Sequence, residues 1–176
     1  MCFDNFMKIE IVVIKNEDEK SKALEIRREV FIDEQGVPED IEIDDFESSS
    51  THFLVYLDEF PVATGRFRIK KSYLKFERIA TLKKSRGQGI GNKLMEFMQN
   101  FALKNFPEFL PAMHAQESAV SFYEKIGWIG VGDRYEEAGI IHQTMIYPPK
   151  KIDGLKVLED PQTNPVILNI LKSIKH

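Results

Sequence analysis

Apolar residues along the chain recur with two different periods, and each period predicts a different kind of element. Residues 8–14 are β-branched and apolar and end at a polar cluster, which predicts a first strand. Asn16 then suits a helix N-cap, and Glu19 follows it at the spacing of a capping box. Apolar residues at helical spacing continue towards Gly36, so one helix is predicted between Asn16 and Gly36.

The rest of the chain alternates the same two patterns. A helix is predicted after the glycine-rich residues 83–91 and ends near Asn105, and a shorter helix is predicted at residues 118–126. Further strands are predicted at residues 52–58, 62–70, 73–82, 109–115, 128–135 and 141–147. The resulting order, βαβββαβαββ, predicts an α+β fold.

Two segments follow neither pattern closely. Residues 37–50 carry six carboxylates without a clear apolar period, so a loop is predicted there. The composition changes after Pro148 and Pro149, which indicates a boundary. Beyond it, Asn164 and Pro165 have the form of a helix start before an apolar stripe. That stripe must bury on the chain's own core or on a second subunit.

Composition excludes several classes of protein. The 176 residues carry a formal net charge of −4, which argues against a nucleic-acid partner. The single cysteine, Cys2, cannot form an internal disulfide or a cysteine-based zinc cluster, and no metal is expected. No apolar run approaches the roughly 20 residues of a membrane span, and the N-terminus lacks the pattern of a secretory signal. A cytoplasmic location and no membrane partner are therefore expected.

The most informative motif is the run Arg-Gly-Gln-Gly-Ile-Gly at residues 86–91, between a predicted strand and a predicted helix. Glycines let the backbone approach a ligand closely, and the N–H groups that begin a helix form an anion site suited to a diphosphate. A P-loop would need Lys-Ser or Lys-Thr after the glycines, and a dinucleotide fold would need a different glycine spacing. A tight turn that merely begins a helix remains the alternative.

Arg86, Gly89 and Gly91 meet the spacing Arg/Gln-x-x-Gly-x-Gly, which resembles the acetyl-CoA pyrophosphate signature of the GNAT acyltransferase superfamily. Residues 77–82 resemble the fourth strand of that superfamily, and residues 119–128 resemble its Ala-x-x-Phe-Tyr-x-x-x-Gly-Phe block. Two further segments resemble the ElaA-like branch: residues 27–37 followed by 42–44, and residues 137–145, although Ile141 stands where members usually have proline.

The resemblance covers about residues 8–147 and implies the GNAT fold. This fold is a mixed central β-sheet of about seven strands, flanked by about four helices, with the fourth and fifth strands splayed apart. We therefore expect a GNAT acetyltransferase domain at residues 1–147 and a C-terminal extension with a short amphipathic helix at residues 148–176.

The resemblance also implies the reaction, in which an amine attacks the thioester of acetyl-CoA directly in a ternary complex, with no covalent enzyme intermediate. The diphosphate would be held by the loop, with Arg86 adding charge. The pantetheine arm would pair with the main chain of the fourth strand. The residues implied for acetyl-CoA are Ile79, Ala80, Thr81, Arg86, Gly87, Gln88, Gly89, Ile90, Gly91, Asn92, Gln116 and Phe122.

Catalysis needs an acid for the departing thiolate and a base for the amine. Tyr123 stands where the family commonly places its acid, and a phenol with a pKa of about 10 matches a thiolate, although a core tyrosine is the alternative. His142 and Glu77 are candidate bases, and His114 remains a further one. The acceptor side is implied at Glu34, Gln35 and Glu137, and the two glutamates could also serve as bases.

Other functions remain open at this point. Arg27 to Phe31 carries an Arg-x-x-Val-Phe pattern that suggests an acyl-homoserine-lactone synthase-like enzyme. The loop could also serve a non-catalytic acyl-CoA sensing module whose C-terminal helix recruits a partner. The acceptor is expected to be a small-molecule or peptide amine, and the acidic residues 39–47 could attract a cationic one or simply be a solvated loop. The C-terminal stripe leaves a homodimer open.

Overall fold

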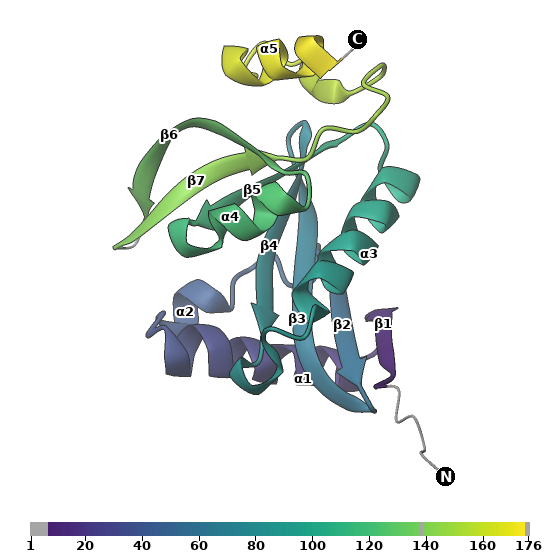
Figure 1. Ribbon diagram of the computed structural model, residues 1–176, viewed down its shortest axis with the longest axis vertical. Helices are drawn as coiled ribbons and strands as arrows, with labels where there is room; N and C mark the ends of the chain where they lie inside the picture. The colour runs from purple at the N-terminus through teal and green to yellow at the C-terminus, as the bar shows by residue number, and fades with distance from the viewer. Residues whose placement is uncertain (1–6, 138, 175–176) are drawn as a thin grey trace. The chain divides into compact units, whose positions relative to one another are not determined.

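The computed structural model describes residues 7–137 and 139–174. Its strands are β1 (Ile9–Val13), β2 (Thr51–Leu57), β3 (Phe60–Lys70), β4 (Tyr73–Thr81), β5 (Leu110–Gln116), β6 (Ile129–Glu137) and β7 (Ile140–Ile146). Its helices are α1 (Glu17–Arg27), α2 (Glu39–Glu42), α3 (Ile90–Asn105), α4 (Glu117–Lys125) and α5 (Pro165–Ile174) (Figure 1). Cys2 and Ala138 lie outside the described residues.

The seven strands form one mixed sheet in the order β1-β2-β3-β4-β5-β7-β6, which confirms the GNAT type of fold. The parallel pairing of β4 with β5 joins Tyr73–Leu110 through Phe76–Met113, and both strands continue beyond it. The chain divides into two compact units. The first unit holds the described residues up to Phe67 together with Arg78–Met98, and the second unit holds Arg68–Glu77 and the residues from Gln99 onward.

The helix predicted up to Gly36 exists, but it changes its type along its length. The Asn16 Oδ1 accepts a hydrogen bond from the Glu19 N–H at 2.9 Å, as the capping pattern predicts. The α-helix α1 then passes into a π-helical segment, η1 (Arg28–Glu34), and a positive φ of 72° at Gly36 turns the chain away.

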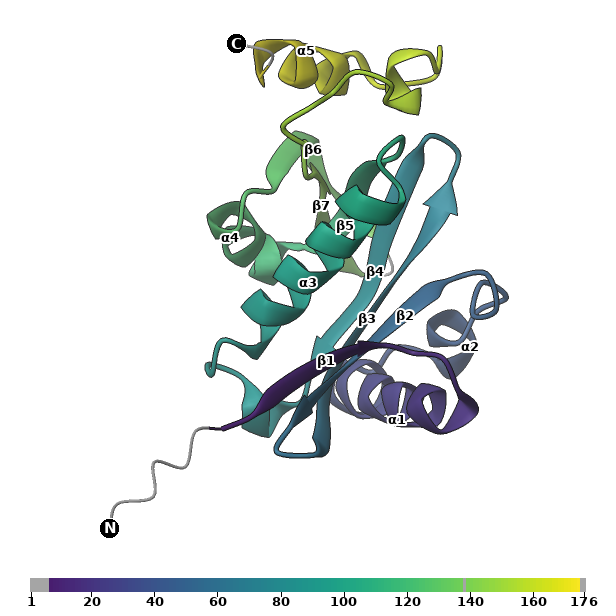
Figure 2. The same cartoon turned by 90° about the vertical axis from the view of Figure 1, so that its right-hand side faces the viewer.

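The first unit places helices on both faces of its strands. Successive residues of a strand point to opposite faces, so Phe53 and Leu54 of β2 contact different layers. The Leu54 side chain packs in a cluster with Ala23 and Ile26 of α1, whereas the Phe53 ring lies 6.0 Å from the Phe97 ring of α3. Figure 2 shows α1 and α3 on opposite sides of these strands.

The acidic segment was wrongly predicted to be a loop that does not pack. Residues Glu39–Glu42 form the short helix α2, and the Glu42 side chain is only 3% exposed. Its carboxylate is paired with the guanidinium groups of Arg27 and Arg78. A buried carboxylate is tolerated only with such partners, and for this reason the segment folds against the strands.

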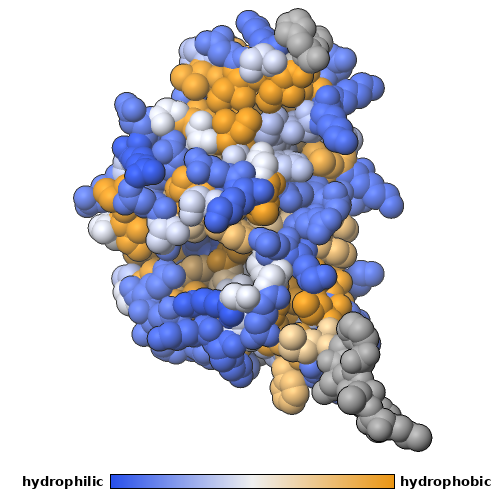
Figure 3. Space-filling view, viewed as in Figure 1, coloured by the Kyte–Doolittle hydropathy of each residue, from blue (hydrophilic) through white to orange (hydrophobic). Residues whose placement is uncertain are grey.

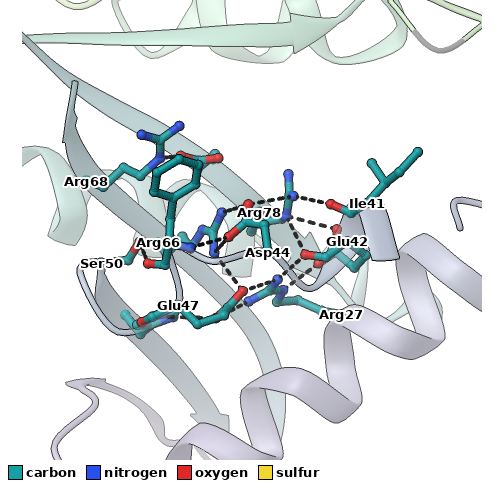
Figure 4. Close-up of polar contacts among 12 residues, drawn as sticks. Arg27, Ile41, Glu42, Asp44, Glu47, Ser50, Arg66, Arg68 and Arg78 are labelled. Atoms are coloured by element: carbon teal, nitrogen blue, oxygen red, sulfur yellow. Dashed lines mark hydrogen bonds and ion pairs between the residues drawn. The ribbon is translucent and has the colours of Figure 1, made fainter. Parts of the chain in front are cut away.

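The network continues through two more carboxylates of the segment (Figure 4). The Glu47 Oε1 lies 2.8 Å from the Arg27 Nη2 and 2.6 Å from the Arg66 Nη1, and the Asp44 Oδ2 lies 2.6 Å from the Arg66 Nη2. Glu39 is also paired, with Arg28, so four of the six acidic side chains are neutralised by arginines of the same unit, which weakens the hypothesis that the segment attracts a cationic acceptor.

In the second unit, α4 and the C-terminal extension pack on opposite faces of the strands. The Phe76 ring of β4 contacts the Trp128 ring at 5.3 Å on the α4 face. On the other face, Leu110 and Ile146 share a buried cluster with Ile167 and Leu171 of α5. The apolar stripe of the tail therefore buries on its own chain, which answers the question that its sequence left open.

The outer side of α5 remains apolar. Val166 is 43% exposed and Ile174 is 36% exposed. Figure 3 shows hydrophobic residues gathered on the surface at this helix. Within the described ranges, no helix is both long enough and apolar enough to cross a membrane.

Candidate functional site

The end of β4 and the loop after it carry most of the residues implied for acetyl-CoA in the first unit. Arg78 lies within β4 and has a φ of 58°, a left-handed conformation that is rare outside glycine. The Arg78 guanidinium is held by the Glu42 carboxylate and by the Ile41 carbonyl. Two residues further along β4, the Ala80 side chain is buried in the cluster that contains Leu54.

The glycine loop has the backbone of an anion site. Gly87 and Gly89 have φ angles of 77° and 76°, and a Cβ added at either would meet nothing within 4 Å, so the surface there is open. The Ile90 side chain is 1% exposed and anchors the start of α3. The first helical bond runs from the Lys93 N–H to the Gly89 carbonyl at 3.1 Å.

This start of α3 leaves the N–H groups of Gly89, Ile90, Gly91 and Asn92 outside the bonding of the helix itself. The first turn carries no acidic side chain that would oppose an anion. The Gln88 side chain is tied back by its Nε2 to the Lys84 carbonyl at 3.2 Å, which keeps it along the loop. The residues present therefore fit a diphosphate.

Arg86 was implied for acetyl-CoA and Glu34 for the acceptor side, and in the structure the two side chains are in contact. The Arg86 Nη1 and Nη2 donate to the two Glu34 carboxylate oxygens, both at 2.7 Å, and its Nε donates to the Thr81 carbonyl at 3.0 Å. The hydrogen bonds from Arg86 lower the pKa of the Glu34 carboxyl. Gln35 follows Glu34 at the end of the π-helical segment.

Tyr123 lies in the second unit on α4. Its side chain is 8% exposed, and its ring contacts the Phe122 ring at 5.0 Å and the Trp128 ring at 6.3 Å. Burial raises the pKa of the Tyr123 phenol well above its ordinary value of 10.0. The hydroxyl therefore keeps its proton at neutral pH, as an acid must before it acts.

His142 lies on β7, opposite Gln116 of β5 and Tyr135 of β6. The His142 Nδ1 lies 2.8 Å from the Ile140 carbonyl, which can only accept, so this nitrogen carries the hydrogen. In the neutral ring the Nε2 then holds the lone pair and can act as a base. The ring also stacks on Tyr135 at a centroid distance of 6.1 Å.

The other candidate bases have different surroundings. The Glu77 carboxylate is held by the Arg68 Nε at 2.6 Å, and both side chains are largely buried. The exposed Glu137 Oε2 lies 3.6 Å from the His114 Nδ1. Burial, followed by the charge of Lys75, lowers the pKa of His114. His114, Glu137 and His142 thus share one part of the second unit, whereas Glu77 is engaged by an arginine.

Tyr135 and Lys75 were not found by sequence reasoning. The Tyr135 ring stands edge-on to His114 at 5.7 Å and so joins the two histidines. Its signal is weak because it lies among the polar residues of β6. Ile141 stands where related proteins usually have proline. It pairs with Glu136 in the β6–β7 ladder, so this position belongs to a strand.

The chain belongs to the GNAT acetyltransferase family, because its residues 15–148 match the family described as Acetyltransferase (GNAT) domain. It is 39% identical over 136 residues to the uncharacterized N-acetyltransferase YjcF of Bacillus subtilis, which covers 77% of this chain and 96% of that protein. It is 30% identical over 123 residues to the protein ElaA of Escherichia coli, which covers 68% of this chain and 80% of that protein. The predicted family and its ElaA-like branch are confirmed.

Solved structures agree on the fold. An acyl-CoA N-acyltransferase from Pseudomonas aeruginosa matches with a TM-score of 0.70 and 23% identity, over 80% of this chain and 98% of that one. A GNAT family acetyltransferase from Elizabethkingia anophelis with acetyl-CoA bound matches with a TM-score of 0.58 and 17% identity, over 78% of this chain and 94% of that one. The protein is thus an N-acetyltransferase of the GNAT family, a family whose members use acetyl-CoA and act on amines.

Proposed function

We propose that the protein transfers an acetyl group from acetyl-CoA to a primary amine by direct attack in a ternary complex. The observation that carries this proposal is the glycine loop at the start of α3. Its backbone N–H groups are outside the helix bonding, no acidic side chain stands in the first turn, and Gly87 and Gly89 leave open space for a diphosphate. No other loop described above combines these three properties.

The remaining residues implied for the cosubstrate fit the same role. The main chain of Ile79, Ala80 and Thr81 lies beyond the segment of β4 that pairs with β5, where the pantetheine amides could add as a strand. In the second unit, Gln116 ends β5 and Phe122 stands beside Tyr123 on α4. We assign these two residues to the pantetheine as well.

Acetyl-CoA, when bound, supplies the thioester carbonyl that the amine attacks and the thiolate that leaves. The Tyr123 phenol donates its proton to that thiolate. Burial raises the pKa of the phenol, which keeps it protonated at neutral pH and also makes it a weaker acid than a free tyrosine. The His142 Nε2 accepts the proton released by the amine, directly or through a water. Glu77 is a weaker base because its carboxylate is paired with Arg68. Glu34, Gln35 and Glu137 are assigned to the acceptor side.

The test is free-thiol release from acetyl-CoA against a panel of amines: polyamines, amino sugars, free amino acids and short peptides. Turnover with one class of amine would establish the reaction and its acceptor. Tight binding of acetyl-CoA without turnover across the panel would instead favour the acyl-CoA sensing module. Turnover only with acyl-carrier-protein thioesters would favour a synthase of the acyl-homoserine-lactone type.

A further inference from the structure

A pocket of about 320 Å³ opens on the second unit, and none of the residues assigned to acetyl-CoA lines it. Its walls come from the end of β3 and its connection to β4, from β4, β5, β6 and β7, and from the C-terminal extension. We call it the lysine pocket, because Lys70, Lys71 and Lys75 line it together with His114. Its volume lies at the lower end of the range of small-molecule sites.

The charge of the lysine pocket is opposite to that of the chain. Three lysines line it and no carboxylate does, whereas the whole protein carries a formal net charge of −4. The Lys71 Nζ is engaged by the Gln162 Oε1 at 2.8 Å. Across the described ranges, no hydrogen bond or ion pair satisfies the Lys75 ammonium, although burial lowers its pKa. A half-buried cation without a partner favours an anionic ligand.

The remaining lining is partly apolar, beside the polar side chains of Thr144, Gln162 and Asn164. Ala112 and Val131 of the strands and Ile167 of α5 are apolar and line the same space, and Met113 also lines it. A ligand that fills the lysine pocket therefore carries a short apolar body beside its anionic group. Inorganic phosphate alone would leave these walls without contacts.

The strand register relates the lysine pocket to His142. His114 pairs with Thr144, which also lines the pocket, and the next pair on the same face along these strands is Gln116 with His142. Lys75 pairs with Ala112, four residues before Gln116, which is roughly 13 Å along the strand at about 3.3 Å per residue. The long side chain of Lys75 can reach along the strand and so shorten the distance that a ligand must bridge to His142. An extended dipeptide covers roughly 7 Å of that distance.

We propose that the lysine pocket holds the carboxylate end of the acceptor, and that the acceptor is an amine whose carboxylate lies at the far end of a short apolar chain, as in an apolar dipeptide. This inference rests on the proposed function, because it takes His142 as the place where the amine reacts. The C-terminal extension contributes Gln162, Asn164 and Ile167 to the pocket, so it takes part in acceptor choice.

The kinetic test compares glycyl-leucine with its C-terminal amide, which differ only in the carboxylate. For the wild-type enzyme we expect a lower KM for the acid. Lys75→Gln should raise the KM for the acid about 10- to 100-fold, the cost of one hydrogen bond to a charged group, and leave the KM for the amide unchanged. Lys75→Arg keeps the charge and should recover most of the difference.

Lys104→Gln is the matched control, because Lys104 is an exposed lysine on α3 in the same unit and lies outside the pocket. It should leave both KM values unchanged. Equal KM values for the acid and the amide, with Lys75→Gln without effect on either, would overturn the inference while the acetyl transfer stands.

A binding measurement separates this inference from the proposed function. N-acetyl-glycyl-leucine has no free amine, so its binding can be followed by amide chemical shifts without turnover. Shifts at His114 and Thr144 that are lost in Lys75→Gln but kept in Lys75→Arg support the pocket even if no amine on the panel is acetylated. The absence of such shifts in the wild-type protein overturns it.

Discussion

At the scale of single residues, the candidate chemistry depends on which groups hold protons. Tyr123 is buried among rings, so its phenol stays protonated, and His142 has one nitrogen committed to a carbonyl. The sequence placed both residues through a motif. It could not place the hydrogen on Nδ1, because that depends on how the His142 side chain turns towards the Ile140 carbonyl two residues before it.

Tyr123→Phe should lower kcat about 10²- to 10⁴-fold, because it removes the proton donor and keeps the ring packing. The dissociation constant of CoA should stay unchanged. Tyr56→Phe is the matched control, because it also removes one phenol hydroxyl and Tyr56, on β2 in the first unit, is not among the residues assigned to the reaction. A kcat of Tyr123→Phe equal to that of the wild type would remove Tyr123 from the mechanism.

Glu34→Gln should tighten CoA binding. In the structure the Glu34 carboxylate holds both terminal nitrogens of Arg86, a residue implied for the diphosphate, so the two anions compete for one guanidinium. At low salt we expect the CoA dissociation constant to fall about two- to fivefold. This change corresponds to roughly the free energy of an exposed ion pair. Isothermal titration with Glu25→Gln as control measures it, and weaker binding would show that the pair positions Arg86 instead.

At the scale of elements, local patterns predicted the strands and the main helices well and failed at the acidic segment. The start of α1 follows from its cap, and α3 follows from its apolar face. The packing of α2 was hidden because its partners Arg27 and Arg78 lie 15 and 36 residues from Glu42, so no local period reports them. Ion pairs between distant residues are set by the fold, and a single sequence does not display them.

Arg27→Met should destabilise the protein by about 3–5 kcal/mol, because it leaves the buried Glu42 carboxylate without one of its two arginines and Glu47 without another. The neighbouring Arg28→Met removes only the ion pair with Glu39, in which both side chains are about half exposed. That loss should stay below about 1 kcal/mol. Urea unfolding of the two variants side by side tests the difference, and equal losses would contradict the buried network.

At the scale of the whole molecule, the C-terminal extension is part of the second unit's core. The sequence predicted its helix and its apolar stripe, and the structure assigns that stripe to a cluster with Leu110, Val131 and Ile146. The matching family spans residues 15–148, so the packing of the tail is a property of this chain beyond the family match. Which surface the stripe covers could not be read from its sequence, because hydrophobic burial is not directional.

Leu171→Ala should cost about 2–5 kcal/mol of unfolding free energy, because Leu171 is fully buried in that cluster. Val166→Ala on the exposed side of the same helix should cost less than about 0.5 kcal/mol. Thermal melts of the two variants provide the comparison. A Leu171→Ala protein as stable as the Val166→Ala protein would mean that α5 does not stabilise the unit on which it packs.

The division into two units also affects how the protein unfolds. The chain passes from one unit to the other three times, within β3, within β4 and within α3, and never at a linker. Units joined by linkers can unfold one at a time, whereas units that share continuous elements resist it. Amide hydrogens of β3, β4 and α3 should therefore exchange in a single cooperative event, and no single proteolytic cut should release either unit as a stable fragment.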